Sequence, residues 1–367
     1  MVDLKSQYQK IKKEIDEVVL TTIASTAYIN GPGVKNFQQS LEKYLGVNHV
    51  IPCANGTDAL QIALMALGLK QGDEVILPAF TYVATAEVVA LLGLKPVLVD
   101  VDRDSFNISI DSLTNHITNK TKAIVPVHLF GQCSNMEAIL KIAKTEGIDV
   151  VEDNAQAIGA DYFNQNGTRQ KAGTIGDIGC TSFYPSKNLG CYGDGGALCT
   201  NDDQLAKQIR LVANHGQNRR YYHDVVGVNS RLDSIQAAIL NIKLKYLDEY
   251  ITARQKAADY YDKALSNISG LQIPKRVKHS AHVFHQYTIL VKDGKRDELK
   301  AFLAEKDIPS MIYYPVPLYK QKAYQSSFEK ELPNTEFLCQ SVLSLPMHTE
   351  LSEEILEYIC DGVQAFF

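Results

Sequence analysis

Hydrophobic side chains recur at helical spacing in the first part of the chain. Between residues 6 and 25, and again between residues 35 and 45, apolar positions fall every three or four residues, as on a helix that buries one face. Residues 49–53 then form a short, mostly apolar run of strand type. The next run, at residues 60–67, is apolar on nearly all sides and predicts a buried helix directly after this strand.

The alternation of strands and helices continues toward the middle of the chain. Further strands are predicted at residues 74–78, 96–100, 122–127 and 149–153, with helices at 85–92, 111–117 and 135–146. This order predicts an α/β fold with helices on both faces of the sheet. Ligands of open α/β sheets bind beyond the carboxyl ends of the strands, so polar residues at those ends should meet in one crevice. These residues are Asn55, Tyr82, His128, Asp153 with Gln156, and Lys187.

The second half of the chain has a different organisation. It contains a strand at residues 180–184, a helix at 203–213 and a single long helix at 233–265, followed by a strand at 286–291 and helices at 297–306 and 352–364. We therefore expect a large domain over residues 1–245 and a small α+β domain over residues 246–367, with the long helix joining them.

Composition narrows the class of partner. The 37 basic and 42 acidic residues leave a net charge of −5 with no long run of either sign, which favours a small-molecule substrate over nucleic acid or a membrane surface. The seven cysteines are odd in number and contain no Cys-x-x-Cys pair, which is typical of reduced thiols in the cytoplasm. The sequence has no signal-peptide core and no run suited to crossing a membrane, so we expect a cytoplasmic protein.

Lys187 is the candidate for covalent chemistry. It follows a predicted strand and Pro185, and the glycines between Gly190 and Gly196 would let backbone approach a flat ligand. Taken alone, it could equally be a surface lysine in a glycine-rich turn. Asn55 likewise is either a plain helix N-cap or the start of an anion site at the helix that follows.

These parts together would suit pyridoxal phosphate. That cofactor needs a lysine amine for a Schiff base, a carboxylate beside the pyridine nitrogen, an aromatic ring to stack on it, and donors for its phosphate. The sequence offers a candidate for each. Three histidines, His279, His282 and His285, have no acidic or cysteine cluster nearby, so we expect no metal site.

Several motifs resemble those of the DegT-type sugar-nucleotide aminotransferases. They are Cys53-Ala-Asn-Gly-Thr-Asp-Ala-Leu60, Pro78-Ala-Phe-Thr-Tyr-Val-Ala-Thr85, Glu152-Asp-Asn-Ala-Gln156, Ser182-Phe-Tyr-Pro-Ser-Lys-Asn-Leu-Gly190, Asn229-Ser-Arg-Leu-Asp233 and Tyr314-Pro-Val-Pro-Leu318. The resemblance implies the fold type I of the aspartate aminotransferase superfamily. In that fold a large α/β domain holds a mostly parallel seven-stranded sheet covered by helices, and a smaller α+β domain follows it.

The resemblance also implies roles for single residues. Lys187 would form the Schiff base and move the substrate proton, and Asp153 would pair with the pyridinium nitrogen. Since some members carry histidine at the lysine position and perform dehydration, the lysine here favours transamination. The other cofactor-binding residues implied are Gln156 and Tyr82 at the ring, Gly56, Thr57 and Ser182 at the phosphate, and Asn229 from the other subunit of a homodimer.

The sugar implied by the resemblance is UDP-2-acetamido-2-deoxy-3-oxoglucuronate, with L-glutamate as amino donor, in surface polysaccharide (O-antigen) synthesis. Arg231 would bind a carboxylate with two hydrogen bonds, and His215 and Tyr314 would line the sugar pocket. Arg231 could instead pair with Asp233 or Asp224. Two alternative functions are a dTDP-3-oxo-6-deoxyhexose aminotransferase and a sugar-nucleotide-binding regulatory protein without enzymatic activity. Tyr313 and Tyr319 stand where family members commonly have histidine.

Overall fold

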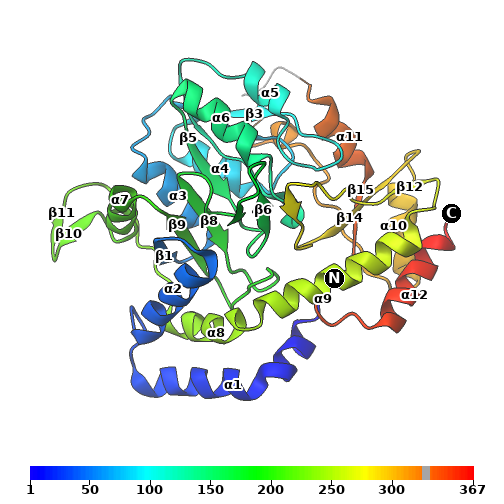
Figure 1. Cartoon of the computed structure of the whole chain (residues 1–367), viewed down its shortest axis with the longest axis horizontal. Helices are drawn as coiled ribbons and strands as arrows, with labels where there is room; N and C mark the ends of the chain where they lie inside the picture. The colour runs from blue at the N-terminus through cyan, green and yellow to red at the C-terminus, as the bar shows by residue number, and fades with distance from the viewer. Residues whose placement is uncertain (325–330) are drawn as a thin grey trace.

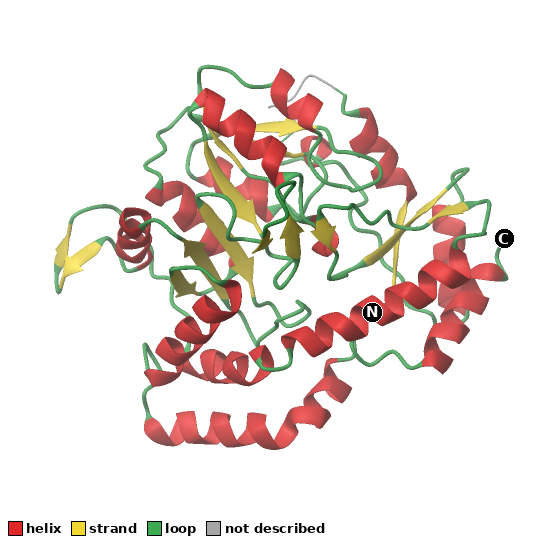
Figure 2. Cartoon of the chain, viewed as in Figure 1, coloured by secondary structure: helices red, strands yellow, loops and turns green. Residues whose placement is uncertain are grey.

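A seven-stranded sheet forms the centre of the larger part of the molecule (Figures 1 and 2). The computed structural model describes residues 1–324 and 331–367. In spatial order the strands are β1 (His49–Cys53), β9 (Gly196–Thr200), β8 (Ile178–Ser182), β5 (Asp149–Asp153), β4 (Thr121–Ile124), β2 (Glu74–Pro78) and β3 (Lys95–Val99). The strands from β8 to β3 pair in parallel, whereas β9 is antiparallel to both of its neighbours. The predicted α/β fold with a mostly parallel sheet is therefore confirmed.

Alternate residues of the strands enter two separate cores, one on each face of the sheet. In β2, Ile76 packs into one core, whereas Val75 and Leu77 pack into the other. Helices α2 (Pro32–Leu45), α5 (Ile110–Asn115), α6 (Met136–Glu146) and α8 (Ser234–Leu244) contribute to the first core. Helices α3 (Gly56–Ala66), α4 (Ala84–Leu91) and α7 (Asp203–Ala213) contribute to the second. Burial on both faces explains why these strands are almost continuously apolar.

A smaller antiparallel sheet lies toward the C-terminus. Its strand order is β12 (Leu271–Gln272), β14 (Tyr287–Val291) and β15 (Val342–Leu345). Helices α9 (Leu247–Leu265), α10 (Arg296–Glu305) and α12 (Glu353–Gln364) share a third hydrophobic core with it. Strand β15 and helix α11 (Pro333–Ser341) had no counterpart among the predicted elements.

The single long helix predicted at residues 233–265 is wrong. The chain has two helices there, α8 and α9, separated at Lys245 and Tyr246. Both residues of the break contact Glu14 of α1 (Leu4–Ser25), through an ion pair and a tyrosine hydroxyl. These contacts act between residues far apart in the sequence, and no proline or glycine marks the break. The break coincides with the boundary that we predict between the two domains.

Two smaller features complete the fold. Strands β13 (Ser280–Ala281), β6 (Asp161–Phe163) and β7 (Arg169–Lys171) form a three-stranded sheet, and η1 (Leu129–Gly131) and η2 (Leu318–Lys320) are single 3-10 turns. The hairpin of β10 (Gln217–Arg219) and β11 (Tyr222–His223) projects from the body beyond α7 (Figure 1). No helix within the described residues is both long enough and apolar enough to cross a membrane.

Candidate active site

Lys187 lies in a tightly anchored loop that begins where β8 ends. Its backbone N–H donates to the carbonyl of Tyr184 at 2.8 Å, which closes a turn. The next residue, Asn188, donates its side-chain amide to the carbonyl of Val283 at 3.0 Å. Further on, the N–H of Cys191 donates to the carbonyl of Phe183 at 2.8 Å. The backbone is thus anchored on both sides of the lysine. Such anchoring is needed for a group that must meet a ligand in one geometry.

Asp153 ends β5, the strand that neighbours β8. Its Oδ2 accepts a hydrogen bond from the hydroxyl of Thr85 at 2.8 Å, and its Oδ1 accepts one from the N–H of Ala155 at 3.1 Å. Burial raises the pKa of Asp153, although these bonds and the nearby Lys187 oppose the shift. Burial in turn lowers the pKa of Lys187 to about 8, and Asp153 opposes that shift. The buried carboxylate of Asp153 and the half-buried amine of Lys187 therefore interact electrostatically. Asp153 ends β5, and Lys187 lies in the loop after the adjacent strand β8.

Gln156 and two tyrosines form a group next to this pair. Gln156 accepts a hydrogen bond from the N–H of Phe130 at 2.7 Å and donates one to the hydroxyl of Tyr314 at 3.1 Å. Burial raises the pKa of Tyr314, so its hydroxyl remains neutral at physiological pH. The ring of Tyr82 lies 6.3 Å from that of Tyr314 and is 58% exposed. An aromatic face is thus left open beside the carboxylate.

The start of α3 lies against the end of β8. A β-carbon added to Gly56 would come within 2.7 Å of the Ser182 β-carbon, so glycine is required for this close approach. The side chain of Asn55 caps the helix by accepting from the N–H of Asp58 at 2.8 Å. The N–H groups of Gly56 and Thr57 have no acceptor within the helix, because they belong to its first turn. Together with the Ser182 hydroxyl, they are donors suited to a phosphate.

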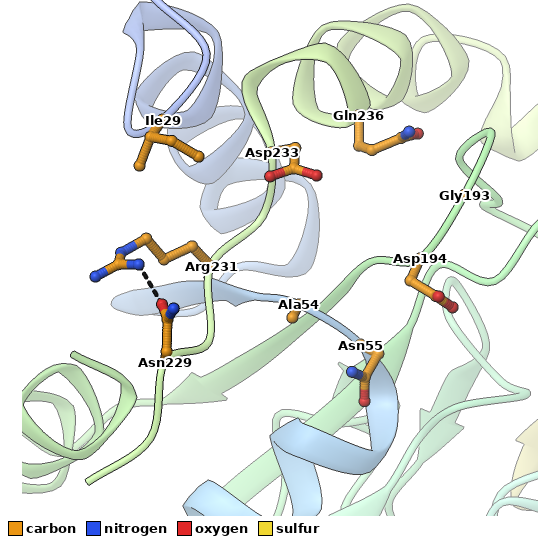
Figure 3. Close-up of a pocket in the computed structure, with 9 residues that line it drawn as sticks. All are labelled: Ile29, Ala54, Asn55, Gly193, Asp194, Asn229, Arg231, Asp233 and Gln236. Carbon is orange, nitrogen blue, oxygen red and sulfur yellow. Dashed lines mark hydrogen bonds between the residues drawn. The ribbon is translucent and has the colours of Figure 1, made fainter. Parts of the chain in front are cut away.

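A cavity of about 540 Å³ opens on the other side of this helix start (Figure 3). It is lined by Ile29, Ala54, Asn55, Gly193, Asp194, Asn229, Arg231, Asp233 and Gln236. The guanidinium of Arg231 donates to the amide oxygen of Asn229, and to that of Asn214 at 3.0 Å. Within residues 1–324 and 331–367, no carboxylate lies within 4.0 Å of it. The alternative pairing of Arg231 with Asp233 or Asp224 is therefore not present.

The predicted site residues thus fall into two neighbouring groups. One group holds Lys187, Asp153, Gln156, Tyr82 and Tyr314 together with the phosphate donors Gly56, Thr57 and Ser182. The other holds Asn229, Arg231 and His215 on the connection between α7 and α8. Ser230 links the two groups, because its hydroxyl donates to Asp58 of α3 at 2.6 Å and accepts from the N–H of Ala54 at 3.0 Å.

Two residues differ from the expected arrangement. His128 is buried, and its Nδ1 accepts from the N–H of Ser134 while its Nε2 donates to Glu152 at 2.7 Å. Its polar atoms are therefore engaged in the fold rather than in the crevice. His215 is exposed at the base of the projecting hairpin; its backbone N–H donates to the carbonyl of Val228 at 2.8 Å, and its neighbour Asn214 accepts from Arg231.

The residues present fit pyridoxal phosphate on chemical grounds. This group of residues offers an amine with a lowered pKa, a buried carboxylate, an exposed aromatic ring and phosphate donors, and Gly56 lets the start of α3 approach Ser182 closely.

A family model covers most of the sequence. The DegT/DnrJ/EryC1/StrS aminotransferase family matches residues 9–364. The chain belongs to this family. It is therefore a sugar aminotransferase that depends on pyridoxal phosphate. Among similar structures is ntda from Bacillus subtilis with bound cofactor PMP, which is 31% identical, has a TM-score of 0.90, and covers 97% of this chain and 82% of its own.

Two curated relatives of this aminotransferase carry different names. One is the "UDP-2-acetamido-2-deoxy-3-oxo-D-glucuronate aminotransferase" of Pseudomonas aeruginosa, 47% identical over 98% of each chain. The other is the "Pleiotropic regulatory protein" of Geobacillus stearothermophilus, also 47% identical, over 100% of this chain and 98% of the relative. The predicted family is confirmed, and the relatives leave the particular sugar open.

Sequence reasoning missed two residues of this aminotransferase's site. Thr85 ends the motif that begins at Pro78, and its hydroxyl donates to Asp153; the sequence indicates the motif but not this contact. Asn214 holds Arg231, and nothing in its local sequence indicates that contact.

Proposed function

We propose that this aminotransferase transfers an amino group from L-glutamate to the 3-keto carbon of UDP-2-acetamido-2-deoxy-3-oxoglucuronate, in the synthesis of a surface polysaccharide. One observation carries the choice of sugar: Arg231 lines a cavity as a cation held by two neutral amides. An arginine placed in this way keeps its charge available for the carboxylate of a uronate. The name of the Pseudomonas aeruginosa relative supports the same sugar.

Each remaining residue has a proposed task. Burial lowers the pKa of Lys187 to about 8, which favours its neutral amine, and Lys187 is proposed to accept a proton from the substrate and return it. Asp153 is proposed to hold the ring nitrogen of the cofactor, with Thr85 fixing the carboxylate. When bound, the cofactor serves as the electron sink that makes the proton next to the nitrogen labile.

The binding residues are assigned in the same way. Gly56, Thr57 and Ser182 are proposed to hold the phosphate, and Tyr82 and Gln156 to contact the ring. Asn229 is proposed to reach the phosphate across a homodimer interface. His215 and Tyr314 are proposed to line the sugar pocket. The β10–β11 hairpin projects from the body and exposes Arg219 and Tyr222 (Figure 1). This supports the proposed homodimer, because the hairpin could contact a second subunit.

The sugar assignment is tested with three substrates and glutamate, by measuring 2-oxoglutarate formation. The substrates are the 3-oxo uronate, its UDP-linked counterpart with CH2OH in place of the carboxylate, and a dTDP-3-oxo-6-deoxyhexose. We expect the native enzyme to prefer the uronate. Arg231→Ala should lower kcat/KM for the uronate by roughly 100-fold, because a charge-assisted pair contributes about 1.5–3 kcal/mol. For the CH2OH counterpart the change should stay below about threefold.

Arg103→Ala is the matched control, since Arg103 is also held by an asparagine amide, that of Asn334 at 2.7 Å, but lies outside the cavity. It should leave all three rates unchanged. Faster turnover of the 6-deoxy sugar or of the CH2OH counterpart by the native enzyme would overturn the uronate assignment. Binding of sugar nucleotide with no 2-oxoglutarate formed would instead favour a regulatory protein.

A further inference from the structure

The loop that carries Lys187 continues into a tip at residues 192–194. The two ends of the loop are fixed at Phe183, whose carbonyl accepts from the N–H of Cys191 and whose N–H donates to the carbonyl of Gly195, both at 2.8 Å. The tip between these bonds reaches the cavity of Figure 3, where Gly193 and Asp194 form part of the wall.

Gln236 of α8 binds this tip through both the oxygen and the nitrogen of its side-chain amide. Its Oε1 accepts from the N–H of Tyr192 at 2.8 Å, and its Nε2 donates to the carbonyl of the same residue at 3.3 Å. A β-carbon on Gly193 would come within 2.9 Å of that Nε2, so the next residue must lack a side chain for both bonds to form. Figure 3 shows Gln236 projecting from its helix toward Gly193 and Asp194.

Two further side chains hold the ring of Tyr192. The ammonium of Lys243, two turns further along α8, lies 5.3 Å from the ring centre, and the ring of Tyr8 from α1 meets it edge-on at 6.1 Å. Tyr192 is nevertheless 38% exposed, so burial alone does not fix the tip. The two amide bonds of Gln236 hold the backbone of Tyr192, and the thiol of Cys191 lies 3.1 Å from the carbonyl of Gly193.

We propose that Gln236 is a positioning residue for the sugar substrate: by fixing the backbone of Tyr192 and Gly193, it sets the cavity wall that faces Arg231. Lys187 does not depend on this contact, because Asn188 and Cys191 anchor the loop between the lysine and the tip. The inference rests on the proposed function, since it takes the cavity as the place where the sugar binds.

The test uses the holoenzyme and whichever of the three sugars the native enzyme turns over. We expect Gln236→Ala to raise KM for that sugar about tenfold, to change kcat less than threefold, and to leave the visible absorbance of the bound cofactor unchanged. Gly193→Ala should raise KM in the same way, because the added methyl group would displace the side-chain amide of Gln236.

Asn241→Ala is the matched control. Asn241 also lies on α8, and its amide donates to the backbone carbonyl of Gly33 at 2.9 Å, outside the cavity that holds Arg231. It should lower the melting temperature as much as Gln236→Ala does, without raising KM.

An unchanged KM in both Gln236→Ala and Gly193→Ala would overturn the inference, as would an equal rise in KM for Asn241→Ala. Failure of the native enzyme to turn over any of the three sugars would instead contradict the proposed function, so the two failures are distinguishable.

Discussion

At the scale of single residues, a hydrogen bond from Thr85 favours the charged form of Asp153. Asp153 is buried, which raises its pKa, and the hydroxyl of Thr85 is the side-chain donor that favours its ionised form. If Asp153 holds the ring nitrogen of the cofactor, as we propose, Thr85 acts on cofactor affinity through the charge of Asp153. Without that hydroxyl, ionisation of Asp153 costs more free energy.

Thr85→Val should therefore raise the Kd for pyridoxal phosphate about tenfold, since a hydrogen bond to a charged group contributes roughly 1.5–3 kcal/mol and valine keeps the volume. Titration of the apoprotein, followed by visible absorbance, measures this. Thr114→Val, which removes an exposed hydroxyl bonded to a helix carbonyl at 2.8 Å, should leave the Kd unchanged. A Kd within twofold of the native value for Thr85→Val would contradict this role.

Single residues also show what local sequence reveals. The position of Lys187 after a strand and before a glycine-rich run made it a candidate, but the Schiff-base role came from the resemblance of the surrounding motifs to the family. The reason for glycine at position 56 was not visible, because it depends on Ser182, more than a hundred residues later. Contacts of this kind, like that of Asn214 with Arg231, appear only when the chain is folded.

Glu152 joins separate elements behind the crevice. Its carboxylate accepts from Nε2 of His128 at 2.7 Å and from the N–H groups of Gly173, Ile175 and Gly176 at 2.6–2.9 Å. Burial raises the pKa of Glu152, but these four donors outweigh burial and the net pKa is lowered. Glu152 precedes Asp153 in β5, so the same strand carries a structural carboxylate and the carboxylate that we propose binds the cofactor.

Glu152→Gln should lower the free energy of unfolding by about 3 kcal/mol at pH 7, because an amide cannot accept from four donors. A lowered pKa in the folded state gives stability above the unfolded value, about 4.3, that is lost as the pH falls through the folded value. The difference from the native protein should therefore shrink below about pH 4. Urea unfolding at pH 7 and at about pH 3 measures this difference.

Glu137→Gln is the control, since within the described part of the chain the Glu137 carboxylate accepts from one exposed N–H, that of Gln165, at 3.1 Å from each oxygen. It should change stability by less than about 0.5 kcal/mol. A destabilisation by Glu152→Gln that is as large at about pH 3 as at pH 7 would show that the charge of Glu152 is not the cause.

Helices and strands were predicted well where the periodicity of apolar residues determines them. They were predicted poorly where contacts between distant residues determine them. The parallel strands are continuous apolar runs and were found close to their observed bounds. Strand β9 was hidden, because Gly196 belongs to the glycine-rich run and its strand begins there. The helical pattern of residues 233–265 continues through Lys245 and Tyr246, and only their contacts with α1 accompany the break.

At the scale of the whole molecule, two sheets and the helices between them bring the ends of β5 and β8 together with η1 and the start of α3. Segments between Gly56 and Tyr314 thereby supply one group of side chains, and the central proposal is that Lys187 in this group carries the cofactor. Lys243 gives a sharp comparison, because it is 1% exposed and burial also lowers its pKa to about 8.

Borohydride reduction of the holoenzyme, followed by peptide mass spectrometry, tests that claim most directly, because reduction fixes the cofactor to the lysine that holds it. The added mass should appear on the peptide containing Lys187, and Lys187→Ala should carry none. Added mass on Lys243, or on no lysine at all, would contradict the account.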